Sequence, residues 1–457
     1  MIRSFASCFS AVVLLGGCAP FELDAFIDLD VNTLAHLEWT TSTAALSWVE
    51  YGFDRDYGMV TPVDQAGVDH SFALLGTPPL TEVFYRAVSE IDGAEREVRG
   101  SIQTGGVPSD LPDFVVNTYD RARTSDDLYI LGTSFGTIPC VYLIDREGNW
   151  LWYKRVNPLK NPIEINFERG SNNILFNSFL IDHGEDDSNV TRVSIDGRVD
   201  EDIDTPFGHH AFTELPDGSI AYLAIDVRDY DLGGEGTMVP VVGDSIDIVP
   251  PGGGAPGSFW SVWDDAFAHD PAWHDRWDSG FYPQGGDWTH ANSLHYYDDS
   301  NTFLISFRNL DMIAEIDADT GAVLREFGGT AGYQLTEGSR SFNYQHDVSW
   351  TADGTLLFIT TDETTFETTA VEYEVDDDAQ TLNEVWSHGD GEGIHVLVQG
   401  TARDLDNGNR LVNFGSSGLV REVTPQGEVV WELEARAGAA FGNTVPFADL
   451  WEPGTAE

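Results

Sequence analysis

Residues 348–386 read VSWTADGTLLFITTDETTFETTAVEYEVDDDAQTLNEVW, and this unit recurs along the chain. Its short apolar runs are separated by turn residues, the first of which are Ala-Asp-Gly at 352–354. Runs of four to eight residues with such punctuation are typical of β-strands. The unit predicts four strands: an opening strand, an apolar strand after the turn, a third strand that ends near Asp376, and a last strand that ends at Trp386.

Five further copies of the unit occur between residues 128 and 431, at 128–152, 173–199, 215–263, 302–324 and 407–431. Six units of four strands, at a period of about 40–55 residues, are typical of a β-propeller. A four-stranded sheet does not bury both of its faces alone, so the units must close into a ring. The sequence therefore predicts an all-β protein in which residues 113–440 form a six-bladed β-propeller.

The third unit is longer than the others. Residues 229–287 are rich in Gly and Pro and contain four tryptophans, Trp260, Trp263, Trp273 and Trp277. A long loop inside a compact domain is usually either functional or disordered. Because this one is aromatic, we predict an ordered cover beside the mouth of the propeller.

Residues 28–105 predict a separate small β-sandwich. Apolar and polar residues alternate in three short runs, 31–39, 45–52 and 82–88, with turn residues between them. Roughly 80 residues is a usual size for this architecture. Trp-Val-Glu-Tyr-Gly at 48–52 and Tyr-Arg-Ala-Val at 85–88 resemble fibronectin type III-like modules. That resemblance implies a spacer or docking unit, followed by a hinge at 105–112.

Residues 1–18 predict export. A basic start is followed by an apolar run at 5–15, which has the length of a signal peptide and is too short to span a bilayer. The run ends in Leu-Gly-Gly-Cys, which resembles a bacterial lipoprotein box. The resemblance implies lipid attachment at Cys18 and tethering to a bacterial membrane, in the periplasm or at the cell surface, and Ala19 favours the outer membrane. An ordinary secretory signal with an incidental cysteine is the alternative.

One cysteine, Cys140, would remain unmodified in the mature chain, because Cys8 is removed and Cys18 is acylated. No intramolecular disulfide is then possible. Cys140 lies in an apolar run, so we predict a buried small hydrophobic residue and not a nucleophile.

The composition restricts the partners. The 457 residues include 77 Asp and Glu but only 23 Lys and Arg, for a formal net charge of −54. Such a charge repels nucleic acid and anionic membrane surfaces, which we exclude as partners. The acidity is typical of a solvated surface suited to salty surroundings. A local cation can still bind an anionic substrate, because salt screens exposed charge beyond roughly 8–10 Å.

Three histidines occupy the same place in three consecutive units. His210, His290 and His346 each lie eight residues before a turn residue of their unit, at positions 218, 298 and 354. This place is near the start of the innermost strand, and innermost strands line the central channel of a propeller. The three side chains should therefore converge. The alternative, a separate core histidine in each unit, explains three residues in register less well.

Arg308 ends an apolar strand 18 residues after His290, which places it across the hairpin in the same unit. A guanidinium matches the oxygens of sulfate or phosphate, so Arg308 is a candidate anion clamp; a surface ion pair is the alternative. Three imidazoles can hold zinc. Equally, a neutral histidine can attack a sulfuryl or phosphoryl centre whose oxygens are held by cations. The spacing alone does not choose between these chemistries.

Several segments resemble the arylsulfotransferase family. They include Trp-Thr-His-Ala-Asn-Ser-Leu at 288–294, the segment 304–313 around Arg308, Phe-Gly-Gly at 327–329, Phe-Asn-Tyr-Gln-His-Asp-Val at 342–348, and the His-His pair at 209–210. The resemblance extends over 114–435 and implies a bacterial arylsulfate sulfotransferase. Such an enzyme moves a sulfuryl group from a phenolic sulfate to a phenol by a ping-pong mechanism through a sulfohistidine, without a nucleotide donor, cofactor or metal.

The resemblance also implies roles for the site residues. In the family order of His, His, Arg and His, the last histidine is the nucleophile, which falls on His346. His210, His290 and Arg308 would bind the sulfuryl oxygens and exchange a proton with the phenol. The neighbouring His209 competes with His210 for the first position, and the eight-residue register favours His210. The side chains expected to bind substrate are His209, Asn292, Trp288 and Tyr344.

The chain departs from better-known members of that family. It lacks their cysteine pair, and its N-terminal module and lipobox imply a monomeric, membrane-tethered variant. Two other functions stay open: a surface-tethered binding propeller without catalysis, and a His-metal hydrolase on the same fold.

Overall fold

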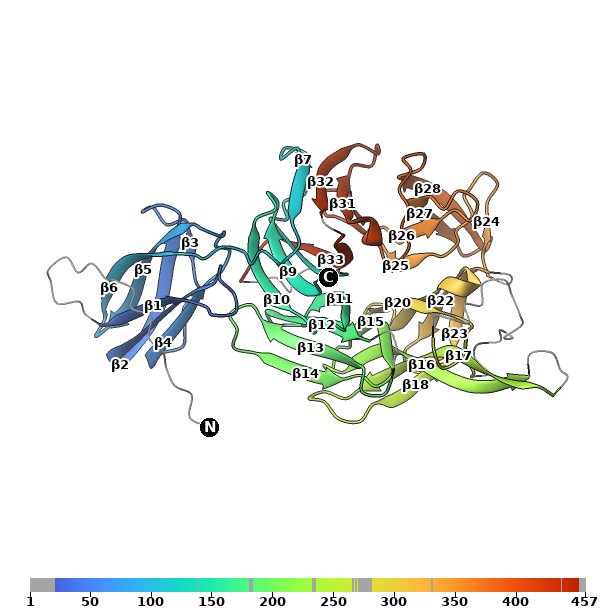
Figure 1. Cartoon of the computed structure of the whole chain (residues 1–457), viewed down its shortest axis with the longest axis horizontal. Helices are drawn as coiled ribbons and strands as arrows, with labels where there is room; N and C mark the ends of the chain where they lie inside the picture. Colours follow the sequence, from blue (N-terminus) through green and yellow to red (C-terminus); the bar gives the residue numbers. More distant parts are fainter. Residues whose placement is uncertain are drawn as a thin grey trace.

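The computed structural model describes residues 21–451 apart from 137, 181–183, 232–235, 265–266, 268, 270–281, 330–331 and 437 (Figure 1). In this part of the chain the regular structure consists of strands and two short 3-10 helices, η1 (Arg308–Leu310) and η2 (Gly415–Ser417). The predicted all-β class is therefore confirmed. None of the helices described is long and apolar enough to cross a membrane.

The N-terminal module is built around one long strand, β2. Strands β1 and β4 pair with the first half of β2, β3 and β5 pair with its second half, and β6 pairs with β5. The bounds are β1 (Leu23–Ile27), β2 (Ala35–Gly52), β3 (Met59–Val60), β4 (Gly67–Leu74), β5 (Glu82–Ile91) and β6 (Ala94–Gln103). Trp39 lies in the core of the module, stacked between Phe21 and Phe72 at ring distances of 5.5 and 5.2 Å.

The prediction of separate strands at 31–39 and 45–52 is wrong. The threonines between the two runs are β-branched and favour an extended backbone, so β2 continues through them. The irregularity lies in the pairing with β4, where the register shifts between Thr40 and Ala45. Strand β1, which begins at Leu23, lies before the predicted start of the module at residue 28.

Residues 114–447 form six sheets that follow one another around a common centre (Figure 1). The first sheet contains β33 (Ala440–Phe447), β8 (Tyr129–Phe135), β9 (Cys140–Asp145) and β10 (Trp150–Arg155). The second contains β11 (Asn161–Phe167), β12 (Asn173–Phe179), β13 (Ser188–Ser194) and β14 (Asp200–Asp204). The third contains β15 (Gly208–Glu214), β16 (Ile220–Asp231), β17 (Met238–Val249), β18 (Gly257–Ser261) and β19 (Gly286–Asp287). The fourth sheet contains β20 (Ala291–Tyr297), β21 (Thr302–Phe307), β22 (Met312–Asp317) and β23 (Val323–Gly328). The fifth contains β24 (Gln334–Leu335), β25 (His346–Trp350), β26 (Leu356–Thr361), β27 (Thr368–Asp376) and β28 (Thr381–His388). The sixth contains β29 (Thr401–Asp404), β30 (Arg410–Asn413), β31 (Leu419–Val423), β32 (Val429–Ala435) and β7 (Phe114–Tyr119).

One strand from each sheet lies at the centre. Strand β11 contacts β33 and β15, β15 contacts β20, β20 contacts β25, and β25 contacts β29. These inner strands bring residues that are far apart in the sequence to one place, and a group of side chains at their ends can form a shared site.

Strands from both ends of this domain close the ring. The last strand, β33, pairs with β8 as the inner strand of the first sheet, and β7 pairs with β32 as the outer strand of the sixth sheet. A buried ion pair joins the same two sheets: Arg146 Nη2 lies 3.0 Å from Glu422 Oε2, and the side chains are 1% and 0% exposed. The Arg146 guanidinium also lies 5.0 Å from the ring centroid of Trp431.

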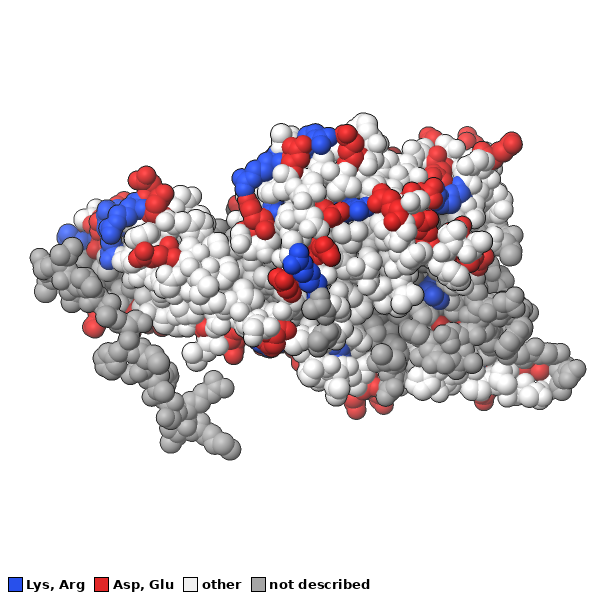
Figure 2. All heavy atoms as spheres, turned by 45° about the horizontal axis from the view of Figure 1, so that its top comes forward, with Lys and Arg blue, Asp and Glu red and all other residues white. Residues whose placement is uncertain are grey.

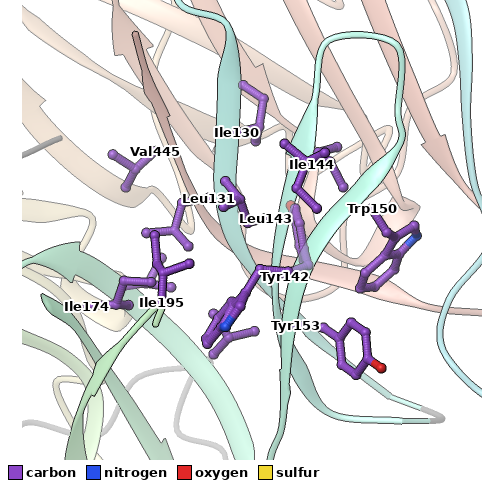
Figure 3. Close-up of a cluster of buried hydrophobic side chains, with 14 of the residues drawn as sticks. Ile130, Leu131, Tyr142, Leu143, Ile144, Trp150, Tyr153, Ile174, Ile195 and Val445 are labelled. Atoms are coloured by element: carbon purple, nitrogen blue, oxygen red, sulfur yellow. The ribbon is translucent and has the colours of Figure 1, made fainter. Parts of the chain in front are cut away.

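Apolar clusters fill the spaces between neighbouring sheets. Figure 3 shows part of the largest cluster, in which Ile130, Leu143 and Val445 of the first sheet pack with Ile174 of the second. Cys140 belongs to this cluster and is fully buried, and burial raises the pKa of its thiol to about 12. The prediction that Cys140 is a buried small residue is confirmed.

The described part of the expected loop at 229–287 contains strands, whereas the predicted cover beside the mouth stays a prediction. Strands β16 and β17 pair along twelve residues each, and β17 and β18 complete the third sheet. Trp260, on β18, is 1% exposed and packs in the cluster between the third and fourth sheets. Trp273 and Trp277, predicted to lie in a cover over the mouth, are outside the described residues.

The charged side chains are spread over the surface. Figure 2 shows acidic residues scattered across the visible face, with basic residues among them. Arg86 illustrates the pattern, because its guanidinium lies within 3.1 Å of carboxylate oxygens of Glu50, Glu95 and Glu97. This one basic side chain thus has three acidic neighbours.

We expect Glu422→Ala to destabilise the protein, because it leaves the Arg146 charge buried without its counterion. The free energy of unfolding should fall by about 3–5 kcal/mol, as measured by denaturant titration. Glu428→Ala is the control: Glu428 pairs with Arg123 on the surface, where both side chains are about half exposed or more, and the loss there should stay below about 1 kcal/mol. Equal losses in the two variants would contradict a special role for the buried pair.

Candidate functional site

The three predicted histidines lie together. His210 is on β15, His290 immediately precedes β20, and His346 is the first residue of β25. The ring centroids of His210 and His290 are 5.1 Å apart, and those of His210 and His346 are 6.3 Å apart. Three neighbouring inner strands thus bring one imidazole each to a shared place at the centre of the domain.

Bulges at the starts of these strands direct the side chains. The pairing register is interrupted between His209 and Phe212, and again directly after Ala291 and His346. His210 and His290 have φ values of 46° and 51°, in the left-handed region that ordinary side chains rarely adopt. Strained backbone of this kind is held in place by its surroundings and is concentrated at functional sites.

The eight-residue register describes the fifth sheet less well. There the left-handed residue is Asp347, with φ 51°, and not His346. His346 pairs with Ile359 on the neighbouring strand, as His209 pairs with Leu223 in the third sheet. The eight-residue spacing therefore identifies the group of histidines, but the histidine of the fifth sheet lies one residue before the left-handed position.

His210, and not His209, is the member of the adjacent pair whose ring contacts the other histidines. His209 lies behind it and is 2% exposed. Its Nδ1 is 3.0 Å from His210 Nδ1, and its Nε2 is 3.1 Å from Asp244 Oδ1. Predicted as a substrate-binding residue, His209 instead connects His210 to a buried carboxylate.

Asp244 is held firmly. Its Oδ2 accepts hydrogen bonds from the Ala291 amide at 2.7 Å and the Thr289 hydroxyl at 2.5 Å. Burial would raise the pKa of Asp244, but the contacts with His209, Thr289 and Ala291 outweigh burial and lower it. The carboxylate is therefore ionised and ties the third sheet to the fourth.

His290 has a carboxylate partner of its own. Its Nδ1 lies 2.5 Å from Asp287 Oδ2, and the two residues are 6% and 1% exposed. The Asp287 carbonyl accepts a hydrogen bond from Asn309 Nδ2 at 3.1 Å. Asp244 and Asp287 were both missed in the sequence, because the segment that contains them reads as a loop; only the Asp-x-x-His spacing of 287 and 290 points to such a pair.

His346 has no carboxylate on its ring nitrogens among the described residues. Its Nδ1 lies 3.1 Å from the carbonyl oxygen of Gly400, which can only accept, so Nδ1 carries the proton. Its Nε2 is buried, without a hydrogen-bond partner in the described part of the chain. Burial lowers the pKa of His346 to about 4; nearby Asp347 opposes this shift, while His290 and Arg308 add to it. The ring is neutral at physiological pH, with its lone pair at Nε2.

Arg308 is the cation of the site. It follows β21, and its amide donates to the His290 carbonyl at 3.1 Å. The guanidinium lies 4.5 Å from the centroid of the Tyr344 ring, and its Nη1 donates to Asn309 Oδ1 at 3.0 Å. Arg308 is therefore placed by its backbone and its side chain at once.

The other predicted substrate-binding residues divide into two groups. Tyr344 lies under Arg308, and Asn292 donates from Nδ2 to the Gln345 carbonyl at 2.7 Å, next to His346. Trp288 is 1% exposed and packs on Trp263, at a ring distance of 4.9 Å, in the core between the third and fourth sheets. Stacking on a phenol is therefore not supported for Trp288. Cys18 lies outside the described residues.

Among the described residues, no group of three or more His, Cys, Asp and Glu side chains has an arrangement that could hold a metal ion. The site combines a guanidinium with three imidazoles, one of which, that of His346, has an unprotonated nitrogen without a hydrogen-bond partner among the described residues. A cation orients an anionic tetrahedral group, and a neutral imidazole can attack its central atom. The arrangement suits the transfer of a sulfuryl or phosphoryl group.

The class of protein that this arrangement indicates is a group-transfer enzyme on an all-β scaffold. A family model described as arylsulfotransferase (ASST) matches residues 115–439. This match covers most of the chain and includes all three histidines and Arg308. The chain belongs to the arylsulfotransferase family.

The remaining comparisons carry no functional conclusion. No curated protein matches the chain. Among solved structures, a periplasmic gluconolactonase from Pseudomonas aeruginosa is similar at 14% identity and a TM-score of 0.38, with 79% of this chain and 95% of that chain covered. A quinoprotein alcohol dehydrogenase-like protein from Bacteroides thetaiotaomicron is similar at 9% identity and a TM-score of 0.36, with 90% and 94% covered.

We expect His346 to make the stability of the protein pH-dependent on the acid side. The folded ring resists protonation down to about pH 4, whereas the unfolded ring takes up a proton near pH 6.5. The contribution of His346 to stability is therefore complete above pH 6.5, decreases as the pH falls through this window, and changes no further below about pH 4. The difference in free energy of unfolding between the wild type and His346→Asn should follow that profile. A His346 ring that titrates near pH 6.5 by NMR in the folded protein would contradict it.

Proposed function

We propose that the protein transfers a sulfuryl group from an aryl sulfate to a phenol, with His346 as the nucleophile. The family supports an arylsulfotransferase. The observation that carries the choice of nucleophile is His346 itself: its Nδ1 is held by a carbonyl, and its buried Nε2 has no partner among the described residues. His210 and His290 each have Nδ1 engaged by a neighbouring side chain instead.

The reaction proceeds in two halves. In the first, the Nε2 lone pair forms a bond to sulfur as the bond from sulfur to the phenolic oxygen breaks, and the departing phenolate takes up a proton from the site. In the second, the acceptor phenol gives its proton back to the site as its oxygen bonds to sulfur and the N–S bond breaks. Each half is balanced without a nucleotide donor or a cofactor.

Arg308 stabilises the charge on the sulfuryl oxygens. In such transfers, positioning and electrostatic stabilisation supply most of the rate. A guanidinium fork can bind two oxygens at once, which an ammonium group cannot do in the same geometry. His210 and His290 complete the set of donors around the group and exchange the proton with the phenols.

We also propose an architecture for the two domains. The six sheets are the blades of a β-propeller, which is supported by the contacts between their inner strands and by the closure through β33 and β7. The N-terminal module is a fibronectin type III-like β-sandwich that acts as a spacer.

The enzymatic proposal is tested by incubating the protein with 4-nitrophenyl sulfate and phenol. We expect phenyl sulfate to form, and mass spectrometry of a reaction without acceptor to find a sulfuryl adduct on His346. His346→Asn should abolish both. Arg308→Lys should reduce kcat/KM roughly 100-fold or more, because one point charge replaces a fork. Sulfuryl transfer by His346→Asn at the wild-type rate would overturn the proposal. Tightly bound zinc, together with release of sulfate to water, would favour the metal hydrolase. The absence of turnover with any aryl sulfate would favour a binding propeller without catalysis.

We further propose that the protein is exported and anchored by a lipid on Cys18, which is supported by the sequence of residues 1–18. Cys18→Ala should move the protein from the membrane fraction to the soluble fraction of the expressing bacterium and abolish labelling by a fatty acid. Labelling that persists in the variant would contradict the anchor.

A further inference from the structure

We propose that Asp287 is a positioning residue that makes His290 the proton carrier of the reaction and thereby opens the site to aryl sulfates of weakly acidic phenols. This inference rests on the proposed sulfuryl transfer. Asp287 is not among the site residues predicted from the sequence. The exchange of a proton with the phenols, which either His210 or His290 could perform, is assigned to His290.

The contact between the two side chains is direct and buried. His290 Nδ1 and Asp287 Oδ2 are 2.5 Å apart and form a hydrogen bond, and hydrogen bonds to carboxylates are stronger than those between neutral groups. Since a carboxylate only accepts, Nδ1 carries the proton and Nε2 is the nitrogen that can exchange a proton with substrate. The carboxylate also stabilises the imidazolium that forms when Nε2 takes up a proton, as in histidine–aspartate pairs generally.

Asp287 is fixed from two further directions. Strand β19, which contains it, pairs in parallel with β17, and the next amide, of Trp288, donates to the Val242 carbonyl at 2.9 Å. The Asp287 carbonyl accepts from Asn309, whose side-chain oxygen accepts in turn from Arg308. The same residue therefore locates both the proton-carrying ring and the anion-binding guanidinium.

The surroundings of the three histidines differ in charge. His210 Nδ1 faces another imidazole, so the nearest carboxylate, Asp244, is one ring further away. His346 Nδ1 faces a neutral carbonyl. His290 Nδ1 faces the carboxylate of Asp287, and a carboxylate in contact with an imidazole favours the protonated form of the ring.

The consequence for substrate choice follows from the leaving group. A phenolate with a strongly withdrawing substituent, such as 4-nitrophenolate, leaves without needing a proton. The phenolate of unsubstituted phenol is a stronger base, so its departure depends on a general acid. An enzyme with an effective Asp287–His290 pair can use aryl sulfates of both strongly and weakly acidic phenols. An enzyme without this pair can use only the aryl sulfates of strongly acidic phenols.

The test compares two donors in one variant, Asp287→Asn. With phenyl sulfate as donor and 4-nitrophenol in excess, kcat/KM should fall roughly 100-fold, as expected on loss of a general acid. With 4-nitrophenyl sulfate as donor, formation of the sulfuryl adduct on His346 should fall less than about threefold, because no acid is required. A loss of equal size with both donors indicates a structural role and overturns the inference, as does an unchanged rate with both.

Two controls make the outcome specific. Asp64→Asn removes a histidine–aspartate contact of the same kind in the N-terminal module, where Asp64 Oδ2 lies 2.6 Å from His70 Nδ1, and should leave the rates with both donors unchanged. His290→Asn should show the same dependence on the donor as Asp287→Asn, and the double variant should lose no more than His290→Asn alone. Additive losses would contradict an action of Asp287 through His290.

Failure of the inference is distinguishable from failure of the proposed function. If the wild type forms no adduct from 4-nitrophenyl sulfate, the proposed function fails. If the wild type forms the adduct and Asp287→Asn handles both donors alike, the proposed function stands and only the role of Asp287 is rejected.

Discussion

A four-stranded sheet with two apolar faces must be covered on both sides, and the architecture of the site depends on this constraint. In residues 114–447 the cover is supplied by the neighbouring sheets, with apolar clusters between them. Packing sheet against sheet requires a ring, and a ring needs a joint between its first and last members. Here the joint is made twice by strand pairing and once by a buried ion pair. The inner strands meet only because that joint holds.

The proposed chemistry depends on differences among three similar rings. A carbonyl, an imidazole and a carboxylate face the Nδ1 atoms of His346, His210 and His290, respectively. Burial keeps His346 neutral because no carboxylate touches its ring nitrogens among the described residues. Groups of one residue type can therefore perform different tasks in one site when their surroundings separate their proton affinities.

Much of this was accessible from the sequence, because repeats translate directly into geometry. The eight-residue spacing predicts that His210, His290 and His346 lie together, and the strand–turn pattern predicts an all-β protein. The two carboxylates were missed for a physical reason: Asp244 lies on a strand whose Gly- and Pro-rich surroundings read as a loop, and Asp287 reaches His290 through a two-residue strand that periodicity does not reveal. The sequence pattern predicts two strands in place of the single long strand β2, because threonines occur both in turns and in extended backbone.

Gly400 links the His346 ring to the packing of the neighbouring sheet. Its φ of 126° suits glycine, and a side chain there would collide with Ile359 and crowd the Asn413 carbonyl. The carbonyl of this residue, which directly precedes β29 of the sixth sheet, selects the tautomer of His346 on the fifth. Sliding of these two sheets past each other would break the hydrogen bond between His346 Nδ1 and the Gly400 carbonyl and would allow the ring to switch tautomers. The position of the proton on His346 is thus sensitive to shear between two sheets, even while Arg308, next to the fourth sheet, keeps its place.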